Sequence, residues 1–141
     1  MSQYGGLYRA KVVENGDDRQ RGRIKVQIPS ITGDGNSQWV DLCMNTAYDA
    51  GGDIAVPKIG DTCWVAFEEG DVTKPVYMGN FFSAFSTPLE NYNVNQRVIS
   101  WDGCRITMEG NNLHIENGAG ATIDMKGNDI QIRAGHVGFN D

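Results

Sequence analysis

The chain has 141 residues, which is enough for one ordinary domain and an appendage but short for two full hydrophobic cores. Asp and Glu number 18 against 12 Lys and Arg, so the formal net charge is -6. Because a phosphate backbone repels such a chain, we expect no nucleic-acid partner.

The three cysteines, Cys43, Cys63 and Cys104, are widely spaced and form no C-x-x-C motif. No histidine stands at metal-ligand spacing from them, so we predict reduced thiols, no metal site and no cofactor. The N-terminal residues MSQYGGLYRAK lack the apolar stretch of a secretory signal, and no apolar run approaches the roughly 18 residues of a membrane span. We therefore expect a soluble protein without a conventional export signal.

Short segments of alternating apolar and polar residues predict an all-β chain. Five candidate strands come first, at residues 7–13, 22–28, 38–44, 62–68 and 75–81. Their linkers are rich in Gly, Asp and Asn, as turns require. Five short antiparallel strands in about 75 residues are typical of a small closed OB-fold barrel rather than of a two-sheet sandwich.

The alternation in the second and fourth strands predicts which side chains form the barrel core. The inward residues are Ile24, Val26, Ile28, Cys63, Val65 and Phe67. Pro29 ends the second strand because proline donates no hydrogen bond to a ladder. The glycine-rich connection at residues 47–58 is predicted to be a loop.

The character of the sequence changes after Phe81. Residues 82–98 lack alternation and contain Pro88 and three Asn, which is typical of a linker or extended arm. We therefore predict three parts: an OB-fold barrel at 1–81, a linker at 82–98 and a C-terminal unit at 99–141.

The C-terminal unit contains a repeat with an offset of 17 residues. Its copies are ITMEGNNLHI (106–115) and IDMKGNDIQI (123–132), and each predicts a β-hairpin. With Gly110-Asn111 as the turn of the first copy, Met108 faces Leu113 and Ile106 faces Ile115. By the same rule Met125 faces Ile130, and Ile123 faces Ile132, in the second copy.

The hairpins place eight apolar side chains on one face, with polar residues on the other. A ribbon of about 35 residues cannot bury such a face alone. Three copies around a threefold axis would cover all three faces, so we predict a homotrimer with a needle-like C-terminal ribbon. The predicted trimer interface is Ile106, Met108, Leu113, Ile115, Ile123, Met125, Ile130 and Ile132.

The N-terminal part carries a specific pattern. The segments RGRIKVQIP (21–29) and VPKIGDTCWVAFEEGDVTKPVYMGNF (56–81), with Trp39 between them, resemble the OB-fold domain of central spike proteins of contractile injection machines. That group includes the tail spike and hub proteins of contractile-tailed bacteriophages and the VgrG-like spikes of type VI secretion. Within the pattern, the turns at Gly60-Asp61 and Gly70-Asp71 close the barrel and perform no chemistry.

The resemblance implies a structural spike of a phage tail baseplate, part of the virion and assembled in the bacterial cytoplasm. Its barrel would be followed by a trimeric β-helical needle that punctures the host cell envelope on contraction. The implied partners are a baseplate hub protein at the barrel end and the target envelope, with a separate tip protein left open. Two alternatives also stay open: a spike of a related contractile injection system and a single-stranded nucleic-acid-binding OB protein.

Two departures from the family concern chemistry. Some phage relatives insert a lysozyme domain between barrel and needle, whereas here only residues 82–98 intervene, so we expect no enzyme. Several phage spikes end in an iron-binding H-x-H tip, but this chain has only His114 and His136. We interpret His136 as an exposed tip residue rather than a metal ligand.

Other polar clusters have plainer interpretations. The carboxylates Asp17, Asp18, Glu68, Glu69 and Asp71 stand in predicted turns without a partner histidine or serine, so we expect solvated loops rather than a catalytic pair. The basic run of Arg19, Arg21, Arg23 and Lys25 is compatible with phosphate binding, but a salt-bridged barrel face or subunit contact is favoured.

Two aromatic residues are predicted to contact the hub. Trp64 alternates with Val65 and so points out of the barrel, where tryptophans often anchor partners. Tyr4 lies in the segment MSQYGG, which we predict to be disordered alone and to become ordered on the hub.

Overall fold

The computed structural model describes residues 3–140 and confirms an all-β fold, with no α-helix among those residues. The chain divides into two compact units, Met1–Thr87 and Pro88–Asp141. No helix in the described part is long and apolar enough to cross a membrane.

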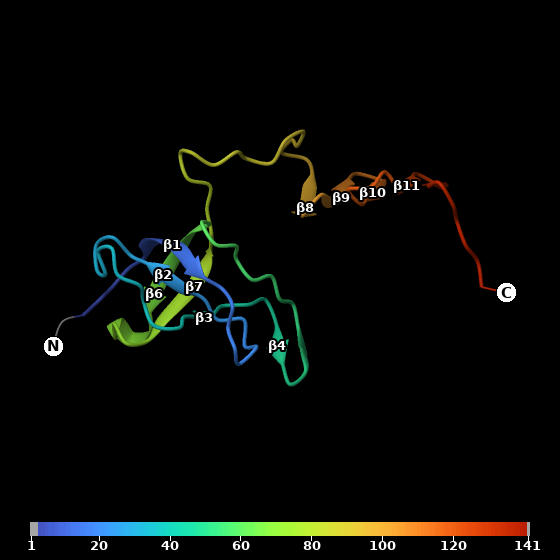
Figure 1. The fold of residues 1–141 in the computed structure, drawn as a ribbon. Helices are drawn as coiled ribbons and strands as arrows, with labels where there is room; N and C mark the ends of the chain where they lie inside the picture. The colour runs from blue at the N-terminus through green and yellow to red at the C-terminus, as the bar shows by residue number, and fades with distance from the viewer. Residues whose placement is uncertain (1–2, 141) are drawn as a thin grey trace. The chain divides into compact units, whose positions relative to one another are not determined.

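The first unit is a curled five-stranded sheet (Figure 1). Its strand order is β2 (Lys25–Gln27), β1 (Tyr8–Glu14), β6 (Thr62–Phe67), β7 (Pro75–Asn80) and β3 (Asp41–Leu42). The two end strands meet at a single bridge, in which the Ile24 amide donates to Val40 O at 3.2 Å and the Val40 amide to Ile24 O at 2.7 Å. This bridge closes the predicted OB barrel.

One expectation about this barrel is wrong. The strands were predicted to be antiparallel throughout, but β3 pairs with β7 in parallel, with Asp41 opposite Val76 and Leu42 opposite Tyr77. The reason is geometric: when five strands close into a ring, strand direction cannot alternate at every neighbouring pair. One parallel pair is therefore required by the closure itself.

The barrel core contains the residues expected from the alternation. Its buried side chains are Ala10, Val12, Ile24, Val26, Ile28, Val40, Cys63, Val65 and Phe67. Burial raises the pKa of the Cys63 thiol to about 12, so this cysteine stays protonated and packs as a small apolar residue. The cysteines are free, as predicted.

The connections refine the prediction in two places. The connection at 47–58 contains a small hairpin of β4 (Ala47–Tyr48) and β5 (Gly51–Gly52), which the glycine content alone indicated as a loop. A short 3-10 turn, η1 (Glu68–Gly70), joins β6 to β7. Gly70 has φ of 77°, a conformation that favours glycine.

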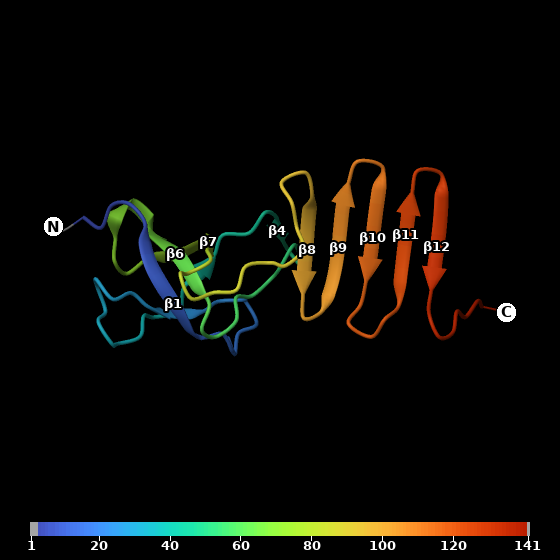
Figure 2. The same ribbon diagram turned by 90° about the horizontal axis from the view of Figure 1, so that it is seen from above.

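The second unit is an antiparallel five-stranded meander (Figure 2). In chain order its strands are β8 (Arg97–Trp101), β9 (Cys104–Glu109), β10 (Asn112–Glu116), β11 (Thr122–Lys126) and β12 (Asp129–Arg133). β8 begins inside the segment 82–98 that was predicted as linker. It escaped the sequence analysis because RVISW has no counterpart in the 17-residue repeat.

Candidate functional site: the apolar face of the C-terminal sheet

The register of the meander matches the predicted hairpins. Met108 lies opposite Leu113 and Ile106 opposite Ile115. In the second copy, Met125 lies opposite Ile130 and Ile123 opposite Ile132. The two hairpins also join each other, because Leu113 pairs with Met125 and Ile115 with Ile123. The eight predicted interface residues therefore share one face of one continuous sheet.

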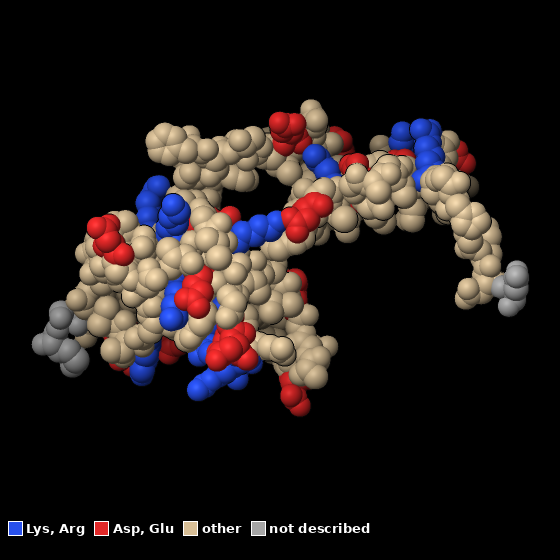
Figure 3. Space-filling model, in the orientation of Figure 1, with Lys and Arg blue, Asp and Glu red and all other residues tan. Residues whose placement is uncertain are grey.

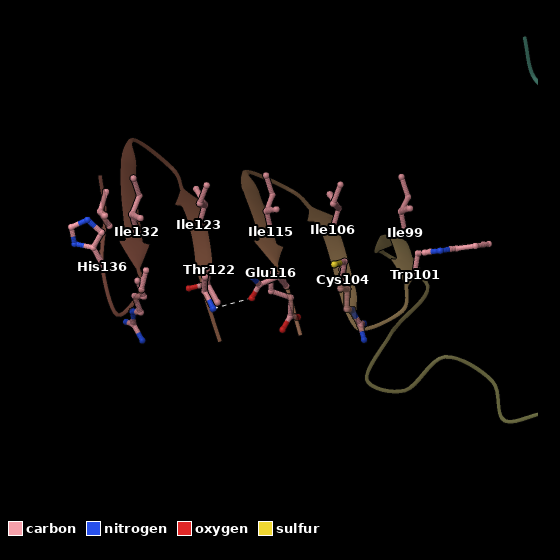
Figure 4. A pocket seen from close by; sticks show the side chains of 16 residues that line it. Ile99, Trp101, Cys104, Ile106, Ile115, Glu116, Thr122, Ile123, Ile132 and His136 are labelled. Carbon is pink, nitrogen blue, oxygen red and sulfur yellow. Dashed lines mark hydrogen bonds between the residues drawn. The ribbon is translucent and has the colours of Figure 1, made fainter. Parts of the chain in front are cut away.

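Side chains on this face form rows that cross all five strands. The first row is Ile99, Ile106, Ile115, Ile123 and Ile132, whose side chains point the same way in Figure 4. The second row is Arg97, Met108, Leu113, Met125 and Ile130. Sequence reasoning missed Ile99, since it lies outside the repeat, although its alternation with Trp101 was visible.

A shallow groove of about 610 Å³ runs beside the isoleucine row (Figure 4). Trp101 and Cys104 line it at the β8 side, and small residues, Ala121 and Ala134, line it near β11 and β12. His136 also borders the groove. The groove is dominated by apolar side chains, so it favours an apolar occupant over a charged one.

Among the described residues of the second unit, none covers this face. No residue between positions 88 and 140 is buried. Ile130 and Ile132 are 66% and 55% exposed, and Ile99 is 51% exposed. Because the unit is a single layer, these isoleucines have water where a folded domain would place a second layer. An exposed apolar face of this kind makes the sheet the candidate surface for assembly with another chain.

The opposite face is polar and forms its own interactions. His114 Nδ1 lies 2.5 Å from Asp124 Oδ1, and this hydrogen bond lowers the pKa of Asp124. The Arg105 guanidinium donates to the carbonyl oxygens of Glu90 at 2.9 Å and Asn91 at 3.1 Å. These groups are suited to contact with water, so the two faces of the sheet differ in polarity.

Trp64 points out of the barrel as predicted, but side chains of its own chain cover part of it. The Arg9 guanidinium lies 5.0 Å from the Trp64 ring centre and 4.8 Å from that of Phe81. The Trp64 and Phe81 rings are 4.6 Å apart and tilted by 39°. This cation–π cluster leaves Trp64 half-buried, with part of the ring still accessible.

The expectation for the N-terminal segment is wrong where the structure describes it. Tyr4 packs on Phe67 with ring centres 5.7 Å apart, and its backbone amide donates to Gly70 O at 3.0 Å. Tyr8 contacts the same phenylalanine at 5.5 Å. The segment therefore has a partner in its own chain, because Tyr4 and Tyr8 shield the Phe67 ring at the end of β6 from water. Met1 and Ser2 lie outside the described residues.

The basic run folds around Asp17. Asp17 accepts hydrogen bonds from Arg23 Nε at 2.9 Å and Nη2 at 2.8 Å, and from the backbone amides of Arg19, Arg21 and Arg23. The Arg23 side chain, first among these donors, holds the pKa of Asp17 well below its usual range. The expectation that Asp17 is a plainly solvated carboxylate is thus wrong, since it organises the whole turn.

The rest of the run follows the favoured interpretation of a salt-bridged barrel face. Lys25 Nζ lies 3.6 Å from Glu14 Oε2. Arg23 and Lys25 both lie over the Trp39 ring, at 5.4 and 4.9 Å. On the face of the barrel seen in Figure 3, positive and negative side chains are interspersed. Arg23 and Lys25 are therefore already paired within the barrel, and a nucleic-acid backbone would have to compete for them.

The remaining carboxylates serve turns. Asp71 accepts hydrogen bonds from the Thr73 hydroxyl at 2.7 Å and its amide at 2.9 Å, and these lower the pKa of Asp71. Glu68 and Glu69 belong to η1, while Asp18 is exposed. Among residues 3–140, no group of three or more His, Cys, Asp or Glu side chains is placed to hold a metal ion.

Comparison with known proteins adds two findings. Residues 8–82 match the family described as "Type VI secretion system/phage-baseplate injector OB domain". A curated relative, "Actin cross-linking toxin VgrG1" of Vibrio cholerae serotype O1, is 34% identical over 73 residues. That match covers 49% of this chain but only 7% of the relative's length. The family match spans β1 to β7 and ends before β8, so it covers the barrel and leaves the C-terminal sheet unmatched.

Proposed function

The chain belongs to the family of type VI secretion system and phage-baseplate injector OB domains, and from this premise we propose that it is a homotrimeric spike. The spike stands at the centre of a contractile phage tail baseplate and is part of the virion, after assembly in the host cytoplasm. It is not an enzyme, and its action is mechanical. A related contractile injection system is the second setting that the family description admits.

The observation that carries the trimer is the uncovered apolar face of the C-terminal sheet. Two isoleucines of its terminal strand are more than half exposed, yet the face is continuous across five strands. Burying such a face contributes about 25 cal/mol per Å² of apolar area. Three copies around one axis cover all three faces together and leave each polar face in water.

The mechanism follows from this arrangement. Contraction drives the needle into the target cell envelope, and interchain burial of the isoleucine and methionine rows keeps the needle rigid. Packed apolar side chains resist deformation because their interiors are close-packed. Force therefore passes along the sheet rather than bending it.

The barrel is the part that holds the hub protein. We place the hub contact at the outer barrel surface around Trp64 and Tyr4, whose exposed parts remain available. The variant Trp64→Ala should still form a trimer but fail to enter particles. Normal incorporation of this variant would move the hub contact to another barrel surface.

The function is tested by comparing particles that carry two spike variants. Met108→Asp places a charge in the apolar rows, whereas Thr107→Asp places the same charge on the polar face of the same strand. Particles with Met108→Asp should fail to permeabilise cells, measured by dye uptake, while Thr107→Asp particles should retain the activity. Full dye uptake with a monomeric Met108→Asp spike would contradict the proposal.

A further inference from the structure

The far end of the C-terminal sheet is open in the single chain. β12 is the last strand, and within residues 3–140 no strand pairs with its outer edge. Ile130 and Ile132 on β12 are more exposed than Ile123 on β11, which is 37% exposed. The apolar rows and the hydrogen-bonding edge of the sheet thus both end without a cover at the same place.

The residues after β12 have the pattern of another strand. Gly135-His136 is a Gly-X pair of the kind found in two-residue type II′ hairpin turns, although Gly135 does not have the positive φ of that turn in the single chain. With this turn, Val137 faces Ala134 and Phe139 faces Ile132. The same counting rule describes the first hairpin, where Glu109 and Asn112 pair on either side of a two-residue turn.

The edge of β12 presents backbone groups in the matching register. Lys126 and Asp129 pair on either side of the turn between β11 and β12. The two residues that flank a two-residue turn exchange both of their backbone hydrogen bonds. Along a strand, the backbone groups of successive residues then point alternately to one neighbouring strand and to the other. Gln131 therefore bonds toward β11, whereas the amides and carbonyls of Ile132 and Ala134 point to the free edge. These are the two residues that the register of the tail requires.

The tail already lies on the apolar side of the sheet. His136 and Val137 border the same groove as Ile132 and Ala134 (Figure 4). Val137 is 42% exposed and Phe139 is 85% exposed, so both have apolar area left to bury. Residues 134–140 contain no Asp, Glu, Lys or Arg, as the uncharged tail in Figure 3 shows. Residues 137–140 therefore carry no charged side chain that would oppose their burial.

We infer that the segment after β12 covers the open edge of the C-terminal sheet. In the trimer, residues 137–140 of each copy pair with the free edge of β12, and Val137 and Phe139 fill the open end of the apolar core. This inference rests on the proposed trimer, because three copies supply the partners that these side chains lack in one chain. The free edge of β12 and the end of the apolar rows are then covered by residues of the same chain.

The test measures amide exchange and thermal unfolding of the full chain. In the wild-type trimer, the Val137 and Phe139 amides should exchange at least tenfold more slowly than the Gly138 amide. Phe139→Asp should abolish this protection and lower the unfolding midpoint of the C-terminal unit by several degrees. Phe85→Asp is the matched control, since Phe85 is 99% exposed and lies in the first unit, and it should change neither quantity.

Three outcomes would overturn the inference. One is a wild-type trimer in which Val137 and Phe139 exchange as fast as Gly138. Another is a Phe139→Asp variant that stays trimeric and keeps the wild-type unfolding midpoint but no longer binds lipid vesicles. That result would make the tail a membrane contact. A wild-type monomer in sedimentation equilibrium would overturn both this inference and the proposed trimer, whereas the first two outcomes leave the trimer intact.

Discussion

The two units of the chain bury apolar surface in different ways. The barrel closes on itself and encloses nine buried apolar residues. The C-terminal sheet aligns as many isoleucine, leucine and methionine side chains on one face, yet residues 88–140 include none that is buried. Both units have the alternation expected of half-buried strands.

The comparison shows that the same strand alternation can occur with or without a core inside the single chain. In the barrel, strand alternation and chain closure act within one molecule, so the unit carries its own core. In the C-terminal sheet, alternation fixes the register, and in the proposed trimer the other copies complete the core. The barrel should therefore fold independently of chain concentration, whereas the sheet should depend on assembly.

The largest expected effect comes from charging the apolar rows. Met108→Asp should abolish trimerisation and unfold the C-terminal sheet, because each copy would bury an unpaired carboxylate. The barrel should keep its own thermal transition, since Met108 lies in the other unit. Circular dichroism with differential scanning calorimetry would separate the two transitions. An unchanged trimer with unchanged transitions would show that this face is not the interface.

A core substitution in the barrel should destabilise the barrel and leave the trimer intact. Ile24→Ala removes a fully buried side chain and should lower the free energy of unfolding of the barrel by about 2–5 kcal/mol. The trimer should persist, because the sheet contributes the apolar rows. Calorimetry and sedimentation of the same sample would check both points. Loss of the trimer in Ile24→Ala would indicate that the barrels, rather than the sheets, hold the copies together.

A smaller effect should appear in the pH dependence of the barrel. The folded-state pKa of Asp17 is depressed, so its contribution is fully present above the unfolded carboxyl pKa of about 3.9 and is lost as pH falls toward the folded value. Asp17→Asn should therefore lower the barrel midpoint at pH 7, with the difference from wild type narrowing below about pH 4. Thermal melts from pH 7 to pH 3 provide the measurement. A difference that stayed constant over this range would mean that the Asp17 charge is not involved.

The smallest expected signal is in nucleic-acid binding, where we expect none. The net charge is -6, and the Arg23 and Lys25 side chains pair with Asp17 and Glu14. We expect no salt-dependent affinity for single-stranded DNA in fluorescence anisotropy at physiological ionic strength. Micromolar binding that weakens with salt would instead support the single-stranded nucleic-acid-binding alternative.

The sequence predicted features that depend on short-range alternation. The inward barrel residues, the hairpin pairings around Gly110-Asn111 and the single apolar face all followed from the period of two in strands. The repeat offset of 17 residues transferred the first hairpin's register to the second. Such features need only neighbouring positions in the chain, so they can be read before the fold is known.

The features that were missed depend on contacts distant in sequence. The parallel pairing of β3 with β7 is a consequence of ring closure, which no local pattern encodes. The packing of Tyr4 on Phe67 joins residues far apart in the chain, as does the Arg9 contact with Phe81. Asp17 was predicted to be an ordinary turn carboxylate, because the backbone amides that donate to it point toward one place only in the folded turn. Ile99 lay outside the repeat that drew attention to the apolar face.

The most direct test of the account is the molar mass of the full chain by sedimentation equilibrium. We expect one species of three chains, because the proposed trimer covers the apolar rows on β8 to β12. The mass should stay constant on dilution through the micromolar range, as expected for a tightly packed apolar interface. A monomer with an intact and folded C-terminal sheet would contradict the central claim that this sheet is completed by other copies.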